Sequence, residues 1–143
     1  MRLVLDTNVV VSAMRSPAGA SAEVIRLAVR KRVTLLGTLA LALEYIEVST
    51  RRSTLQGTNI SSADAERFAN QVIALLDPVE IRFDWRPLAP DPDDDLVMMA
   101  ALNGAADAVV TFNLRDFLAP AHAFGLQVMT PAHILMKVGE NRE

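Results

Sequence analysis

Short apolar runs without a polar face are the feature that most constrains the fold. They occupy residues 3–5, 33–36 and 108–110, and polar or turn-forming residues bound each of them. Runs of this length are too short for a helix, and without alternation they indicate strands covered on both faces. Segments with helical spacing separate them. This order predicts an α/β fold with a central, mainly parallel sheet, and the length of 143 residues suits a single domain, 1–143.

Caps and helix breakers define the expected boundaries. Ser21, Thr38 and Ser61 or Ser62 are typical N-cap residues, and Gly104 is a typical C-cap. We expect strands at 3–5, 33–36, 79–83, 108–110 and 126–129, a helix after the first strand, and further helices ending near residues 31, 51, 76, 103 and 138. The strand at 79–83 alternates apolar and charged residues, so it should lie near an edge of the sheet. Residues 84–92 and the segment around residue 116 are predicted to be loops.

Composition excludes several classes of site. The chain contains no cysteine, which rules out a disulfide framework, a zinc–thiolate site and a cysteine nucleophile. Its two histidines lie in no polar cluster, and it has no glycine-rich phosphate loop or nucleophile elbow. No apolar run reaches the length of a membrane span, so we expect a cytoplasmic protein without membrane contact. The net charge of −3 gives no bulk attraction to nucleic acid.

The acidic residues carry the chemical information. Asp6 directly follows the first apolar run, where a carboxylate is costly unless it is paired, caps a helix or holds a metal. Glu44 lies in an otherwise apolar helix opening, whereas Glu47, one turn later, suits a solvent-facing position. Asp116 follows the strand at 108–110 and is explained either by turn chemistry or by a site.

Four carboxylates crowd the segment from Asp91 to Asp95. The start of a helix tolerates negative charge, and capping accounts for one or two of them, such as Asp93 or Asp94. Capping does not account for Asp95, which heads the most apolar helix of the chain. This excess of negative charge indicates a bound cation.

Taken together, these acids predict a metal site. In parallel sheets, functional residues gather beyond the carboxyl ends of the strands. Carboxylates without histidine or cysteine form an all-oxygen site, which suits Mg²⁺ or Mn²⁺. Such ions bind phosphates, so the chemistry implied is phosphoryl transfer or phosphodiester hydrolysis.

The spacing of four blocks resembles the PIN domain family, and within it the stand-alone prokaryotic toxins of toxin–antitoxin pairs. The blocks are Asp6-Thr-Asn8 after the first strand, Glu44 in an early helix, Asp-Pro-x-Asp-Asp95 opening an alanine-rich helix, and Thr111-x-Asn113-x-x-Asp116. The resemblance implies an α/β/α sandwich and a Mg²⁺- or Mn²⁺-dependent ribonuclease acting on single-stranded RNA. It assigns catalysis and metal binding to four acids: Asp6, Glu44, Asp95 and Asp116.

The same resemblance places supporting residues around these ligands, namely Thr7, Asn8, Asp94, Thr111 and Asn113. Asn113 stands where many relatives carry a second acid, so either it or Asp116 completes the site. We favour Asp116 because only a carboxylate helps to hold a second cation. For contacts to RNA phosphates the best placed side chains are Arg15 and Arg115, followed by Arg51 and Arg52.

Partners and alternatives also follow from the resemblance. We expect an RNA substrate, a separate antitoxin protein, and a homodimer or higher homo-oligomer. Trp85 either stacks on a base or anchors its own proline-rich loop. Two other functions stay open. One is a PIN fold that only binds RNA or protein. The other is a phosphatase of the haloacid dehalogenase type, although that class requires a second Asp where this chain has Asn8.

Overall fold

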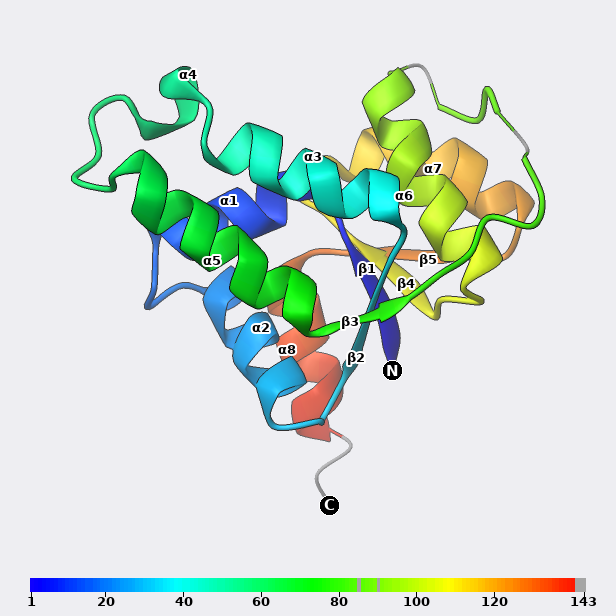
Figure 1. The fold of residues 1–143 in the computed structure, drawn as a ribbon. Coiled ribbons are helices and arrows are strands. Elements are labelled where there is room, and N and C mark those ends of the chain that lie inside the picture. Colours follow the sequence, from blue (N-terminus) through cyan, green and yellow to red (C-terminus); the bar gives the residue numbers. More distant parts are fainter. Residues whose placement is uncertain (85, 90, 141–143) are drawn as a thin grey trace.

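A parallel sheet of five strands forms the centre of the computed structural model, which describes residues 1–84, 86–89 and 91–140 (Figure 1). The strand order is β3-β2-β1-β4-β5, and every neighbouring pair is parallel. The strands are β1 (Arg2–Leu5), β2 (Thr34–Gly37), β3 (Leu76–Pro78), β4 (Ala108–Val110) and β5 (Gln127–Met129). The first strand of the chain is thus the central one, and its residues 3–5 are fully buried. The predicted parallel sheet is confirmed.

Helices cover both faces of this sheet. They are α1 (Thr7–Arg15), α2 (Ala20–Val29), α3 (Leu39–Ser49), α4 (Arg52–Leu55), α5 (Ser62–Ala74), α6 (Pro92–Asn103), α7 (Leu114–Ala123) and α8 (Pro131–Glu140). Figure 1 shows α1, α2, α5 and α8 on one side of the strands, and α6 and α7 on the other. Helix α3 packs against α1, α5 and α6, so it bridges the two layers. The architecture is the expected α/β/α sandwich. None of the described helices is long and apolar enough to cross a membrane.

The caps are only partly as predicted. Thr38 and Ser61 accept hydrogen bonds from the third residue after each of them, and Gly104 ends α6, as expected. Helix α2 begins earlier than predicted, because Gly19 and not Ser21 occupies its N-cap. At α6 the capping side chain is Asp91, which accepts from the backbone N–H of residue 93. Capping therefore does not account for Asp93 or Asp94.

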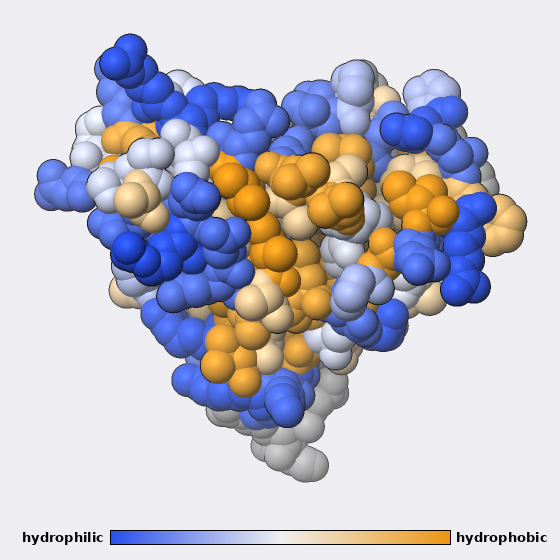
Figure 2. Space-filling model, in the orientation of Figure 1, coloured by the Kyte–Doolittle hydropathy of each residue, from blue (hydrophilic) through white to orange (hydrophobic). Residues whose placement is uncertain are grey.

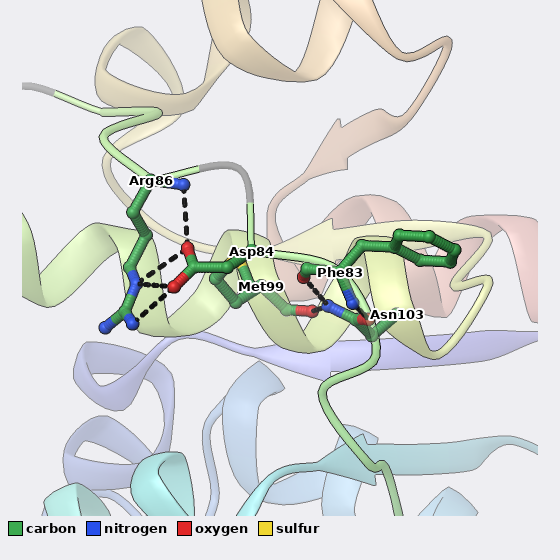
Figure 3. A network of polar contacts seen from close by, with 5 residues as sticks. All are labelled: Phe83, Asp84, Arg86, Met99 and Asn103. Carbon is green, nitrogen blue, oxygen red and sulfur yellow. Dashed lines mark hydrogen bonds and ion pairs between the residues drawn. The ribbon is translucent and has the colours of Figure 1, made fainter.

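The predicted strand at 79–83 is wrong, because β3 covers residues 76–78. The N–H of Val79 still donates to the Gly37 carbonyl at 2.9 Å, and the residues after it leave the sheet. The side chain of Asn103, the last residue of α6, forms hydrogen bonds with backbone groups of this segment (Figure 3). Its Oδ1 accepts hydrogen bonds from the N–H groups of Arg82 and Phe83, at 2.8 and 3.0 Å. Its Nδ2 donates to the carbonyls of Phe83 and Met99, at 3.0 and 2.9 Å. A side chain thus replaces the neighbouring strand.

Asp95 holds the other end of the same segment. Its Oδ1 accepts from the N–H groups of Leu88 and Ala89, at 2.9 and 2.7 Å. Residues 95, 99 and 103 follow each other at intervals of four and so share one face of α6. Between the two anchors, Arg86 forms an ion pair with Asp84 at 2.7 Å (Figure 3). We call residues 82–89 the strap; Trp85, for which we expected a stacking or packing role, lies outside the described residues.

Helix α7 is a second difference, since the chain around Asp116 was predicted to be a loop. Phe117 and Ala121, four residues apart, are buried and form the apolar face of this helix. Pro120 lies inside it and lacks the N–H of a regular helical residue, which hides the pattern in the sequence. Asp116 therefore lies in the first turn of a helix.

Replacing Asn103 with alanine should release one end of the strap. The change removes the acceptor of two N–H groups and the donor to two carbonyls, those of Phe83 and Met99. Each net hydrogen bond is worth about 1 kcal/mol. We expect the free energy of unfolding to fall by about 1–3 kcal/mol. Amide hydrogen exchange should become faster at Arg82 and Phe83.

Asp95→Ala is the matched variant, because it should instead speed exchange at Leu88 and Ala89. Unchanged exchange at residues 82 and 83 in Asn103→Ala would show that Asn103 does not hold the strap.

Candidate active site

Asp6 lies where the central strand ends and α1 begins. Its N–H donates to the carbonyl of Val110 at 2.9 Å, which extends the pairing of β1 with β4 by one residue. Its side chain is 7% exposed and makes no capping bond to α1. Instead, the Thr111 hydroxyl donates to Asp6 Oδ2 at 2.7 Å. The carboxylate is thus held at the edge of the sheet and not used as a helix cap.

Thr111 is fixed by the neighbouring strands. It follows β4 directly, is fully buried, and its N–H donates to the Met129 carbonyl at 2.9 Å. Its hydroxyl also accepts from the N–H of Asn113 at 2.9 Å. A single hydroxyl therefore links the site acid to the start of α7.

Glu44 approaches the same site from α3. Its side chain is half-buried, and the Thr7 hydroxyl donates to Glu44 Oε2. Glu47, as expected, is exposed and forms an ion pair with Arg51 at 3.2 Å. The two glutamates of α3 therefore have different roles, one at the site and one on the surface.

Tyr45 lies beside the candidate site, and the sequence pattern did not single it out. Its side chain is fully buried, and its hydroxyl donates to the carbonyl of Leu5, the residue before Asp6, at 2.5 Å. Burial, followed by the charges of Asp6 and Glu44, raises the pKa of Tyr45, so it stays a neutral donor. The only signal in the sequence is a tyrosine in an apolar helix next to an acid.

The structure separates the consecutive acids of α6. Asp95 is 5% exposed and its Oδ1 is bonded to the strap. Asp94 is 9% exposed, and its charged neighbours include Asp6 and Asp116. Asp94, which was expected to support the ligands, is thus an acid on which the charges of Asp6 and Asp116 act.

Three carboxyl groups at this end of the sheet, those of Asp6, Glu44 and Asp94, have raised pKa values. Burial is the main cause for Asp6, whose pKa is raised despite the Thr111 hydrogen bond, and for Glu44, whose pKa is raised despite Thr7. Burial together with the surrounding carboxylates raises the pKa of Asp94 to about 7. The charges that act on Asp94 are those of Asp6, Asp91, Asp116 and Asp93, all negative. Such a cluster is stabilised by protons or by a cation.

The donor set fits a hard divalent ion, although the acids are not drawn together around one. Among the described residues, no group of three or more acidic or histidine side chains is arranged to hold a metal ion. Every donor of the cluster is a carboxylate oxygen, which suits Mg²⁺ or Mn²⁺. Mg²⁺ keeps several waters when it binds, so it needs few direct protein ligands.

A cavity of about 590 Å³ opens beside these acids, between α1 and α3. Asp6, Glu44 and Asp93 contribute its negative charges, and Arg15 and Arg51 its positive ones. The remaining candidates do not line it: Arg52 lies at a separate depression near α4, and Asn113, Arg115 and Asp116 are exposed at the start of α7. The predicted RNA contacts are therefore divided between two regions.

Residues 2–115 match the model of the PIN domain family. The chain belongs to this family. A chain in the crystal structure of VapBC2 from Rickettsia felis, bound to a DNA fragment from the promoter, has the same fold with a TM-score of 0.60. The superposition covers 90% of this PIN domain and 97% of that chain at 17% identity. None of the curated proteins matches this PIN domain.

The stability of this PIN domain without metal should fall as the pH rises. Asp94 has a pKa of about 7 when folded, above the value of about 3.9 of an unfolded aspartate. The folded state then binds more protons between these values, so the free energy of unfolding decreases from about pH 4 to pH 7 and levels off above. Asp6 and Glu44 act in the same direction.

Thermal unfolding in the presence of a chelator at several pH values measures this effect. Asp94→Asn should reduce the pH dependence and raise the Tm at pH 8. A wild-type Tm that rises between pH 5 and pH 8 would contradict the prediction that the clustered acids destabilise the fold when they are charged.

Proposed function

We propose that this PIN domain is a Mg²⁺- or Mn²⁺-dependent endoribonuclease that cleaves single-stranded RNA. Asp6, Glu44, Asp94 and Asp116 would hold the metal and carry catalysis. The observation that supports this most is the pKa of Asp94, raised by burial and by carboxylates alone. A cluster of this kind persists in a fold when a cation compensates it.

Asp94 takes the place that the sequence pattern gave to Asp95. Both carboxylates are buried, but Asp95 Oδ1 already accepts two backbone hydrogen bonds from the strap. The charge of Asp94 faces those of Asp6 and Asp116. Asp116 is kept as the fourth acid in preference to Asn113, because its charge also acts on Asp6.

The chain's own residues would orient the reacting groups. A bound Mg²⁺ or Mn²⁺ would lower the pKa of a coordinated water and neutralise charge on the phosphate. The Thr111 hydroxyl fixes the Asp6 carboxylate, and Thr7 fixes Glu44. Tyr45 holds the backbone carbonyl just before Asp6. Outer groups of this kind typically change metal affinity or activity 10- to 100-fold.

We further propose that the chain acts as the toxin of a toxin–antitoxin pair. The similar structure from Rickettsia felis was determined as VapBC2 with promoter DNA, which supports a partner protein. The surface offers apolar contact area for the antitoxin or a second copy: Figure 2 shows apolar side chains in a band over α3 and beside α5. Leu39 and Leu43 on α3 are 76% and 57% exposed. We also expect a homodimer or higher homo-oligomer, and light scattering measures its mass.

Cleavage of a fluorescent single-stranded RNA tests the nuclease and the assignment of its acids. Asp6→Asn and Asp94→Asn should each lower kcat/KM by about 100-fold or more, since even outer groups are worth 10- to 100-fold. Asp95→Asn should lose stability but keep cleavage when assayed well below its Tm. Activity should require Mg²⁺ or Mn²⁺ and disappear with a chelator.

The outcomes separate the alternatives. If Asp94→Asn and Asp95→Asn lose cleavage equally while Asp95→Asn is still folded, Asp95 would be a metal ligand after all. RNA binding without cleavage by the wild type in either metal would indicate a binding module. Hydrolysis of a phosphate monoester but not RNA would indicate the phosphatase, which the PIN family match disfavours.

Metal binding can be measured without any substrate. Mg²⁺ or Mn²⁺ should raise the Tm of the wild type with the logarithm of its concentration, because it binds only the folded state. The shift should be much smaller in Asp94→Asn. A wild-type Tm that neither ion changes would contradict the metal site.

A further inference from the structure

The cavity beside the acids is a groove, and helices α1 and α3 form its two walls. From α1 it is lined by Asn8, Val11, Ser12 and Arg15, and from α3 by Glu44, Val48 and the following Arg51. These positions recur every three or four residues, so each set forms one helix face. Arg15 comes seven positions after Asn8, and Arg51 comes seven positions after Glu44. At about 1.5 Å per residue, Arg15 lies roughly 10 Å along α1 from Asn8, which itself follows Asp6 by two positions.

The groove is therefore acidic at one end and basic at the other. The Arg15 side chain is exposed and makes no hydrogen bond or ion pair within the described part of the chain. The Arg51 side chain is bonded to Glu47 alone among the residues that the structure describes, through a surface ion pair at 3.2 Å. Exposed pairs of this kind contribute little, so a phosphate can replace Glu47 as the partner of Arg51. Two available guanidinium groups at one end of a groove suit phosphate oxygens.

The lining between the two ends is uncharged. It consists of Val11, Ser12 and Val48, and Asn8 Oδ1 is buried beside them without a hydrogen-bond partner in the described residues. A buried acceptor without a partner is costly unless a ligand or water supplies a donor. The sugar hydroxyl of a ribonucleotide is such a donor, and phosphates alone are not.

We propose that this groove binds the backbone of single-stranded RNA, with Arg15 and Arg51 holding a phosphate beside the one that is cleaved. This inference rests on the proposed function for its direction, since it places the scissile phosphate at Asp6 and Glu44. The strand runs along α1 and α3, with its sugar over Asn8. Arg52 and Arg115, which line other surfaces, lie outside this path.

Direct binding tests the groove independently of cleavage. The probe is a fluorescent single-stranded RNA of eight nucleotides, and the protein is the Asp6→Asn variant in Mg²⁺, at several salt concentrations. Adding Arg15→Ala and Arg51→Ala should weaken binding at least about tenfold. The slope of log K against log salt should become shallower by about 0.7 for each phosphate that the protein no longer binds.

Arg30→Ala with Arg67→Ala is the matched control, because it removes the same charge from α2 and α5. Both arginines pair with surface acids, Glu23 and Asp64, away from the groove. Equal affinity and equal salt slope in the two double variants would overturn the proposal. Thermal unfolding of both double variants shows that each is folded at the assay temperature.

The Glu47→Gln variant tests the groove through a gain in RNA affinity. Releasing Arg51 from its ion pair should tighten RNA binding a few-fold, and Arg51→Ala should cancel this gain. Glu23→Gln removes a similar charge on α2 and should have a smaller effect. A gain that survives Arg51→Ala would overturn the role of Arg51.

The sugar contact has its own readout. Asn8→Ala should reduce the preference for RNA over DNA of the same sequence, and an unchanged preference would overturn the placement of the sugar. If the groove variants lose binding while the wild type fails to cleave RNA, the groove stands and the nuclease fails. If the wild type cleaves RNA but the groove variants bind RNA normally, the nuclease stands and the groove proposal fails.

Discussion

Acidic side chains at the carboxyl end of the sheet impose the constraint to which the rest of the structure responds. Asp6 must be buried because it ends the central strand, and burial raises its pKa. The surrounding groups are neutral donors: a hydroxyl from Thr111, a hydroxyl from Thr7 beside Glu44, and a phenol from Tyr45 on the adjacent backbone. Neutral donors orient the carboxylates without neutralising them. The negative charge thereby stays available to a cation, and a bound ion would recover its cost in stability.

Helix α6 divides two tasks between consecutive residues. Because each residue turns the helix by about 100°, Asp94 and Asp95 face different surroundings. One joins the acids of the site, and the other holds the strap together with Asn103, two turns further along. Asp91 caps the same helix, so the first turn of α6 has both a capping bond and the bonds of Asp95 to the strap. The position of the site acid depends on a segment that does not line the groove.

The sequence is most informative where one physical effect dominates. The buried strands and the place of Asp6 at the end of the first one follow from apolar runs, and the helix start at Thr38 follows from its cap. Prediction fails where a side chain competes with regular structure, as Asn103 does for residues 82 and 83. It also fails where a proline hides a helix, as in α7. Choosing between Asp94 and Asp95 requires the phase of the helix, which its cap at Asp91 sets and which the run of aspartates leaves open.

The central position of the first strand has a consequence for how the protein is made. Asp6 leaves the ribosome well before the hydroxyl that positions it, which comes 105 residues later. Pairing of β1 with β4 likewise closes a loop of about that length, which is slow and entropically costly. A nascent chain therefore carries this acid without the groups that orient it. For a chain proposed to cut RNA, this connectivity delays assembly of the candidate site until most of the domain has been synthesised.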